Sequence, residues 1–176
     1  MKMEIKELRE RLKKVRVNNV KAFRAFVIAL YYTGARPREI IRMKSKHIKK
    51  DNNYLSIHIP DNKEGTDRKI PIIYTRSLIK ELYNYAASCP EDMYLFYMYR
   101  PSHGSTDYTN KLRYPFHKFL GVSPMYFRHN RFAKMARKGA SLKQLKYFKG
   151  TTHYKSVFRY INIDEEKAKK SASLID

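Results

Sequence analysis

One apolar stretch near the start of the chain limits the folds that this sequence can adopt. Between Asn19 and Gly34 the sequence reads VKAFRAFVIALYYT, which is dense in Ala, Phe, Ile and Leu. Asparagine is favourable at the start of a helix, and glycine commonly ends one because it accepts the left-handed backbone conformation. The stretch is shorter than the run of about 18 apolar residues that indicates a membrane-spanning helix. We therefore expect a buried helix at the centre of a globular core.

Two further helices are expected beside this central one. Residues 3–15 carry apolar side chains at three- and four-residue steps: Ile5, Leu8, Leu12 and Val15. This spacing predicts an amphipathic helix. In the segment RPREIIRMK, Pro37 is placed to begin a short helix, because a proline at the first helical position sacrifices no hydrogen bond. Arg36 should therefore lie where this short helix starts.

The middle of the chain has the pattern of a small antiparallel sheet. YLSIHI alternates polar and apolar residues, PDNKEGTDR supplies turn residues, and KIPIIY is again apolar and β-branched. The pattern predicts a hairpin or small antiparallel sheet near residues 54–73, with a basic tip. Between Pro90 and Pro101, MYLFYMY fits either a buried strand or a loop that its aromatic side chains pack.

Helical patterns dominate the rest of the chain. We expect helices over five further segments: 75–87, 108–119, 124–138, 141–148 and 154–161. Together with the sheet, they give a mainly helical fold of the α+β class. A chain of 176 residues fits one domain of ordinary size.

The charge of the chain points to a polyanionic partner. It has 38 Lys and Arg against 16 Asp and Glu, for a formal net charge of +22. A compact domain with such an excess repels itself unless an anion normally lies against it. We favour nucleic acid as this partner over a membrane surface, and over a cationic surface that is simply solvated.

Two features favour an intracellular protein. The start of the chain, MKMEIKELRERLKK, is charged and lacks the apolar core of a signal peptide. The single cysteine, Cys89, cannot form an internal disulfide.

Four segments follow one another along the chain in an order that is typical of one family. They read YTGARPREI, NKEGTDRKIP, PMYFRHNRFAKMARKGA and GTTHYKSVFRY. A single basic residue in any of them is usually just solvated, but the ordered set is a much stronger signal. Over roughly residues 20–162 the chain resembles the catalytic domain of the tyrosine recombinase (phage-type integrase) family. The resemblance implies that family's mainly helical fold with a small antiparallel sheet.

The first two segments supply an arginine and a lysine. The family's first arginine lies in Thr-Gly-x-Arg-x-x-Glu-Leu, so the resemblance implies that Arg36 binds phosphate and that Glu39 is its structural support. The family's lysine lies in a β-hairpin, five residues before an Arg-x-x-Pro, which here is Arg68 to Pro71. Lys63 therefore takes the lysine position.

The last two segments supply a second arginine and the nucleophile. The family's second arginine lies in His-x-x-Arg-His followed by Phe-Ala, which makes Arg128 its counterpart here. The family's tyrosine lies ten residues after the glycine of Leu-Gly-His, and ten residues after Gly150 is Tyr160. Tyr154 is a rival nucleophile by residue type, but the spacing favours Tyr160.

Two positions depart from the family pattern. Met125 occupies the histidine position before the second arginine, and Thr151 occupies the histidine or tryptophan position after the glycine. Neither side chain carries an imidazole. His129, His153 and Thr151 are candidate accessory residues. His129 fits a packing histidine as well, and His153 shares a helical face with Tyr160 only if no break follows Gly150.

The resemblance implies a reaction without cofactor or metal. One DNA strand would be cut, held through a 3′-phosphotyrosyl link to Tyr160, and rejoined to a second duplex. Arginines stay protonated and bind phosphate oxygens in pairs, so they can neutralise the extra charge of the transition state. Lys63 would protonate the departing 5′ oxygen. Double-stranded DNA is the expected partner, with self-association into dimers or tetramers on it.

Other functions remain open at this point. The chain fits a catalytically impaired DNA-binding module of the same fold, which Met125 and Thr151 favour, or a type IB topoisomerase-like DNA-relaxing enzyme. A basic RNA- or ribosome-binding protein is the remaining alternative.

The resemblance also divides the chain. Residues 1–163 would form the catalytic domain and residues 164–176 a C-terminal tail, which either docks on a neighbouring protomer or is a frayed end. The family usually carries a separate N-terminal DNA-clamping domain, which implies a fragment or a minimal form. The abundance of Lys, Ile, Asn and Tyr points to an AT-rich genome, such as that of a virus or plasmid of a prokaryote, archaea included.

Overall fold

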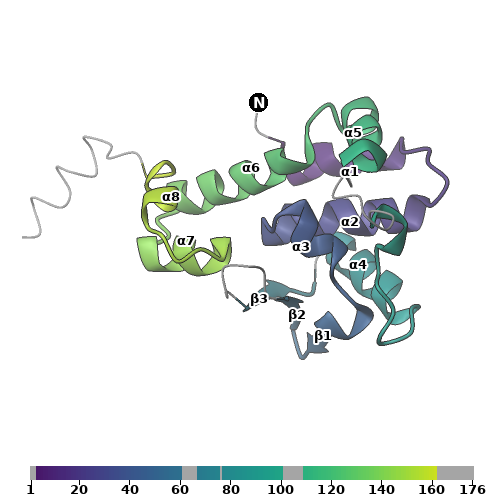
Figure 1. Ribbon diagram of the computed structural model, residues 1–176, viewed down its shortest axis with the longest axis horizontal. Coiled ribbons are helices and arrows are strands. Elements are labelled where there is room, and N and C mark those ends of the chain that lie inside the picture. Colours follow the sequence, from purple (N-terminus) through teal and green to yellow (C-terminus); the bar gives the residue numbers. More distant parts are fainter. Residues whose placement is uncertain (1–2, 61–66, 76, 101–108, 162–176) are drawn as a thin grey trace, which may run out of the picture.

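The computed structural model describes residues 3–60, 67–75, 77–100 and 109–161. Figure 1 shows helices over most of this chain and one small sheet at the lower edge of the view. The helix α2 (Val20–Thr33) lies in the middle and packs mainly against α4 (Ser77–Ala87) and α6 (Pro124–Arg137). The amphipathic helix α1 (Ile5–Lys13) buries Leu8 and Leu12, as its spacing predicts.

The central helix forms where its sequence predicts it. The side chain of Asn19 accepts a hydrogen bond from the backbone N–H of Ala22 at 3.0 Å, which caps the first turn. The helix ends at Gly34, in the left-handed conformation, and α3 (Pro37–Ile41) begins three residues later. Nearly every side chain of α2 is buried, and Phe23 and Phe26 pack edge to face against Phe116.

The sheet has three antiparallel strands in the order β1 (Ile48–Asp51), β2 (Tyr54–Ile59) and β3 (Arg68–Ile73). Its apolar face is buried and comes from alternate positions of β2 and β3: Leu55, Ile57, Ile59, Ile70 and Ile72. The expected ribbon over residues 54–73 is therefore confirmed. The strand β1 follows the 3₁₀ turn η1 (Ser45–His47) and extends the ribbon to a sheet.

The second half of the chain supplies the remaining helices. The helix α5 (Thr109–Pro115) continues into the π-helical segment η3 (Phe116–Leu120), and α6, α7 (Leu142–Lys149) and α8 (Lys155–Phe158) follow. The last helix is shorter than the expected range 154–161. The stretch MYLFYMY proves to be a loop with one 3₁₀ turn, η2 (Tyr97–Tyr99), and it buries Leu95 and Phe96.

Two apolar clusters hold the described residues together. The larger one surrounds α2, and the smaller consists of Phe132, Ala136, Leu145 and Val157, with Tyr160 packed against it. The smaller cluster therefore attaches α7, α8 and the segment after α8 to the far half of α6. Among the described residues, no helix has both the length and the apolar character needed to cross a membrane.

Candidate active site

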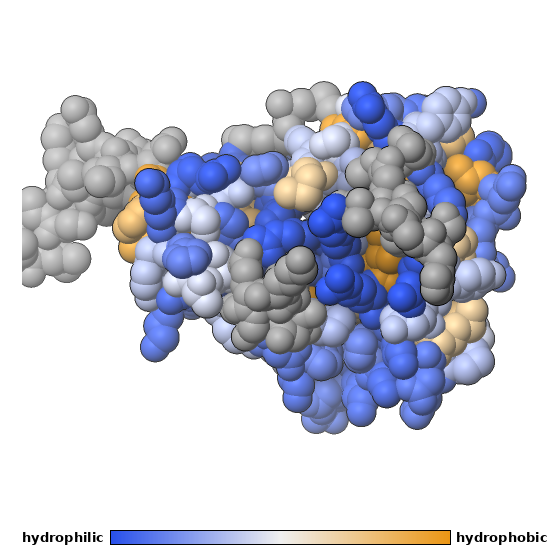
Figure 2. All heavy atoms as spheres, in the orientation of Figure 1, coloured by the Kyte–Doolittle hydropathy of each residue, from blue (hydrophilic) through white to orange (hydrophobic). Residues whose placement is uncertain are grey.

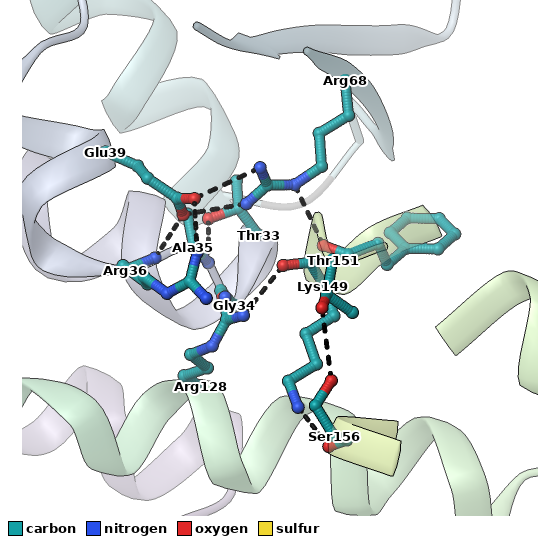
Figure 3. A network of polar contacts seen from close by, with 11 residues as sticks. Thr33, Gly34, Ala35, Arg36, Glu39, Arg68, Arg128, Lys149, Thr151 and Ser156 are labelled. Carbon is teal, nitrogen blue, oxygen red and sulfur yellow. Dashed lines mark hydrogen bonds and ion pairs between the residues drawn. The ribbon is translucent and has the colours of Figure 1, made fainter. Parts of the chain in front are cut away.

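Arg36 lies at the junction between α2 and α3, and Glu39 fixes its backbone. The N–H of Arg36 donates to Oε2 of Glu39 at 2.6 Å, and its Nη1 lies 3.5 Å from Oε1 (Figure 3). The side chain of Glu39 is 3% exposed, whereas that of Arg36 is 33% exposed. The anchored backbone and the accessible guanidinium make Arg36 suited to binding a ligand.

A second arginine, Arg68 at the start of β3, occupies the other side of the Glu39 carboxylate. Its Nη2 donates to Oε2 at 2.9 Å, its Nη1 to Oε1 at 3.4 Å, and its Nε to the carbonyl of Phe148 at 3.1 Å. Burial by itself raises the pKa of Glu39, but the hydrogen bonds and charge of Arg68 and the N–H of Arg36 bring that pKa below its ordinary value. Glu39 is therefore a buried anion between two arginines.

The position of Arg68 explains the glycine that ends α7. Gly150 has φ +60°, and a Cβ placed on it would collide with Nη1 of Arg68 and lie 2.6 Å from its Cζ. A side chain fits there only if the guanidinium of Arg68 moves, because real Cβ atoms essentially never show contacts this short. Gly150 thus lets the guanidinium pass directly over the backbone at the end of α7.

Arg128 projects from α6 into the same region and is buried. Its Nη1 donates to the carbonyl of Gly34 and its Nη2 to the carbonyl of Lys149, both at 2.8 Å. These carbonyls lie at the C-terminal ends of α2 and α7, where the helix dipoles favour a cation. Burial lowers the pKa of Arg128 to about 10, and the charges of Arg36 and Arg68 act in the same direction. Arg128 therefore stays protonated at neutral pH.

Three guanidinium groups thus lie in one region. Arg36, just before α3, and Arg68, in β3, bond to Glu39, and the charge of Arg128, from α6, also lowers the pKa of Glu39 (Figure 3). Sequence reasoning selected Arg36 and Arg128 but used Arg68 only to align the motif. The available signal was that Arg68 is a charged residue in phase with Ile70 and Ile72, on the buried side of the alternating strand β3.

Lys149 and Thr151 organise the turn between α7 and α8. Both are buried, and the ammonium of Lys149 bonds to the carbonyl of Ser156 and lies 5.2 Å from the ring centre of Tyr160. The hydroxyl oxygen of Thr151 accepts hydrogen bonds from the N–H of His153 and the hydroxyl of Ser156, each at 3.3 Å. The turn is thereby fixed immediately before the segment that carries Tyr160.

Tyr160 lies against α6, and its hydroxyl meets a histidine. The distance from its Oη to Nδ1 of His129 is 3.0 Å, and its ring packs near that of Phe132. Burial raises the pKa of Tyr160, while the charges of Arg128 and Arg159 oppose this increase. Tyr154, in contrast, is 43% exposed and has Lys146 over its ring. The geometry therefore favours Tyr160 over Tyr154 as the tyrosine of this site.

The sequence as a whole matches the model of the phage integrase family over residues 2–167, which include every described residue of this site. The chain belongs to the phage integrase (tyrosine recombinase) family. This confirms the resemblance noted in the sequence. A search of curated protein sequences finds no match.

Solved structures of tyrosine recombinases share the fold. XerH recombinase bound to its difH substrate has a TM-score of 0.75 and 18% identity, with 99% of this chain and 54% of that one covered. XerA recombinase gives a TM-score of 0.65 at 18% identity, covering 99% and 63% of the two chains. The Tn1549 transposon integrase in complex with circular intermediate DNA gives 0.67 at 16% identity, covering 100% and 67%. The chain therefore spans about half the length of XerH.

Within this tyrosine recombinase, the departures from the family pattern lie at different places. Met125 is exposed in the first turn of α6 and lines a cleft of about 410 Å³ with Pro37, Arg113 and His117. His153 is exposed; its backbone N–H donates to the hydroxyl of Thr151, and its carbonyl accepts from the hydroxyl of Ser156. Lys63 lies outside the described residues. The structure thus brings together Arg36, Glu39, Arg128, Thr151, Tyr160 and His129.

Proposed function

We propose that this chain is the catalytic part of a site-specific DNA recombinase or integrase, which cuts and rejoins DNA through a 3′-phosphotyrosyl link to Tyr160 without a metal ion. One observation carries this proposal. Arg36 bonds to Glu39, and the charge of Arg128 acts on both Glu39 and Tyr160. The helix α6, which supplies Arg128, also supports Tyr160. Attack by a tyrosine on a phosphodiester requires fixed cations that stabilise the negative charge gained by the phosphate.

The two arginines act on the phosphate. Arg36, with its accessible guanidinium, and Arg128, fixed by the carbonyls of Gly34 and Lys149, bind non-bridging oxygens and stabilise the negative charge that develops there. Glu39 keeps Arg36 in place, and its negative charge offsets that of Arg68. Arginines remain protonated at neutral pH, so they supply this charge without a metal.

The tyrosine attacks the phosphorus, and the lysine protonates the leaving 5′ oxygen. Tyr160 Oη forms a bond to phosphorus as the bond to the 5′ oxygen breaks, and Lys63 donates a proton to that oxygen. Rejoining is the reverse attack by a 5′ hydroxyl on the phosphotyrosine. Thr151 contributes by ordering the turn before Tyr160, and His153 is exposed beside this turn.

DNA as the partner is supported by charge as well as by the site. The formal net charge is +22, and hydrophilic residues cover most of the face shown in Figure 2. Beside the sheet, Lys46, Lys49, Lys50 and Lys69 line one hollow of about 710 Å³. The XerH and Tn1549 structures are complexes with DNA. A phosphate backbone fits such a surface.

The wider setting follows from the same proposal. The chain acts inside a prokaryotic cell, from a viral or plasmid genome, and self-associates on DNA as a dimer or tetramer. Residues 1–163 form the catalytic domain, and the tail 164–176, which lies outside the described residues, docks on a neighbouring protomer.

The test is covalent trapping on nicked DNA. The unmodified chain is incubated with duplexes whose sequence is randomised around a nick, so that the cut end diffuses away and the adduct accumulates. We expect adducts that resist denaturation, that form in the presence of a metal chelator, and that are absent from Tyr160→Phe. Sequencing of the trapped DNA then gives a defined substrate for all later variants.

Each alternative predicts a different outcome of this test. DNA binding without any adduct would identify an impaired DNA-binding module, which Met125 and Thr151 favour. Adducts followed by relaxation of supercoiled plasmid, with no exchange between two duplexes, would identify a type IB topoisomerase-like enzyme. Adducts that persist in Tyr160→Phe would remove Tyr160 from the site.

A further inference from the structure

The described residues contain one direct contact to the hydroxyl of the proposed nucleophile from a group that can take a proton. Nδ1 of His129 lies 3.0 Å from Oη of Tyr160. General bases act at this heavy-atom separation of about 2.6–3.2 Å. His129 follows Arg128 directly on α6, so one stretch of helix carries both the phosphate-binding arginine and this imidazole.

The place of His129 on α6 relates it to the missing histidine. It lies four residues after Met125, and residues four apart are neighbours on one face of a helix. A thioether cannot accept a proton from a phenol, whereas an imidazole one turn further along the same face can. An imidazole therefore lies one helical turn after the position that lacks it.

We propose that His129 is the general base for Tyr160: its Nδ1 takes the phenolic proton while Oη forms the bond to phosphorus. The inference rests on the proposed phosphotyrosyl reaction. As the P–O5′ bond breaks, its electron pair leaves with the 5′ oxygen, which is protonated by the general acid. In rejoining, the phenolate leaves phosphorus and takes the proton back from the imidazolium of His129.

The groups around His129 keep it ready to accept. Burial lowers its pKa, and the charges of Arg159, Arg128 and Lys149 lower it further. These cations come from three elements, α6, α7 and the segment after α8, and Tyr160 completes the surroundings. With its pKa below the ordinary value of about 6.5, His129 is neutral at pH 7. Its Nδ1 is the acceptor when the ring proton is on Nε2.

The same contact admits a different role, in which His129 only holds Tyr160 away from the DNA. The two roles predict opposite effects of removing the imidazole. A base accelerates cleavage, so its loss slows the reaction, whereas a restraint on the nucleophile delays attack, so its loss speeds the reaction.

The central experiment is His129→Asn in single-turnover cleavage of the nicked duplex selected with the unmodified chain. Asparagine keeps a hydrogen-bonding atom near the place of Nδ1 but is not basic. We expect cleavage at pH 7.5 to fall by about 10²- to 10⁴-fold, the usual contribution of a general base. DNA affinity should be unchanged. His117→Asn, an exposed histidine on η3, is the matched control and should cleave within about twofold of the parent.

Two further readouts separate a base from a packing residue. In the parent, the cleavage rate should fall on the acid side of pH 6.5 as His129 becomes protonated, and this limb should vanish in His129→Asn. A fluorinated tyrosine at position 160, whose phenol has a lower pKa, should recover much more activity in His129→Asn than in the parent. A purely structural defect would not respond to the acidity of the nucleophile.

These experiments distinguish failure of the His129 proposal from failure of the proposed phosphotyrosyl reaction. No adduct with the unmodified chain counts against that function and against this inference together. Normal adducts through Tyr160, combined with His129→Asn cleavage that is within a few fold of the parent or faster, overturn the inference alone. Nuclear magnetic resonance of labelled histidine adds a test without DNA: His129 should titrate below pH 6.5, and its ring signals should shift in Tyr160→Phe.

Discussion

Arg68 and Glu39 form an ion pair whose two side chains are only 1% and 3% exposed, although they come from a strand and a helix that are distant in sequence. The same guanidinium also bonds to the carbonyl of Phe148 near the end of α7. One buried side chain therefore connects the sheet, the Arg36 junction and the helix that leads to Tyr160. Arg68 positions the site without itself being an expected phosphate ligand.

Gly150→Ala should destabilise the chain strongly. The left-handed backbone alone costs about 1–2 kcal/mol for a residue with a Cβ, and the new methyl would also displace Arg68 from Glu39. Denaturant unfolding measures the loss. Gly139→Ala is the matched control, because Gly139 has φ +83° but nothing lies within 4 Å of an added Cβ. A loss no larger than that of the control would contradict the close contact with Arg68.

The free energy of unfolding should depend on pH because Glu39 ionises at a lower pH in the folded chain than in the unfolded chain. The pKa of Glu39 is lower in the folded chain than its ordinary value of 4.5, so the unfolded chain binds the proton more readily. The stabilisation by the ionised carboxylate is therefore complete above pH 4.5 and is lost as the pH falls through the folded pKa. Unfolding at a series of pH values should show this slope.

Glu39→Gln is the comparison for that slope. It should unfold more easily at neutral pH, by about 3–5 kcal/mol, because a buried arginine loses its charged partner. Its remaining acid dependence between pH 5 and 3 should be shallower than that of the parent. Parallel slopes in the two proteins would show that folding does not lower the pKa of Glu39.

Arg36→Ala and Arg128→Ala should both slow cleavage of the trapped substrate by about 10²-fold or more, as expected for losing one fixed donor to a developing charge. Their stabilities should differ. Arg36 is partly exposed, whereas Arg128 is buried and bonds to two helix ends, so only Arg128→Ala should lower the unfolding free energy markedly. Arg38→Ala, exposed in α3 two residues after Arg36, is the control for cleavage and should retain it.

The elements with strong periodicity could be predicted from the sequence. The cap at Asn19, the apolar run and Gly34 define α2, and the alternation of YLSIHI and KIPIIY defines β2 and β3. β1 could not be predicted, because IKKD exposes three successive residues and shows no alternation. α8 is shorter than expected mainly at its C-terminal end, because the N–H groups of Tyr160 and Ile161 bond to the carbonyls three residues earlier and form a tight turn in place of further α-helix.

The site could be predicted only as far as local motifs reach. The spacing of the family motifs selects Arg36, Arg128 and Tyr160, and the structure brings these residues into one region. The pairing of Arg68 with Glu39 and the contact of His129 with Tyr160 depend on how β3, α3, α6 and the last segment pack together. Contacts between such distant elements leave no periodic trace in the sequence.

Deleting residues 164–176 should weaken strand exchange and leave DNA cleavage nearly intact. The tail ends in Leu174 and Ile175 behind the charged run DEEKAKKSA, a pattern that fits a short docking segment with an apolar tip. The truncated chain should still form adducts on the nicked duplex, but its self-association on DNA and its strand exchange should weaken. Equal loss of cleavage would mean that the tail supports Tyr160 in its own subunit, and unchanged exchange would identify a frayed end.

Lys63→Ala should be slow on ordinary DNA and recover on a substrate with a sulfur in place of the bridging 5′ oxygen. A thiolate is a much better leaving group than an alkoxide, so its departure does not need the proton that Lys63 is proposed to donate. Arg36→Ala provides the comparison, since a residue that stabilises charge on the non-bridging oxygens is still needed with the sulfur substrate. Recovery of both variants, or of neither, with DNA binding intact would assign Lys63 to phosphate binding or to structure and not to proton donation.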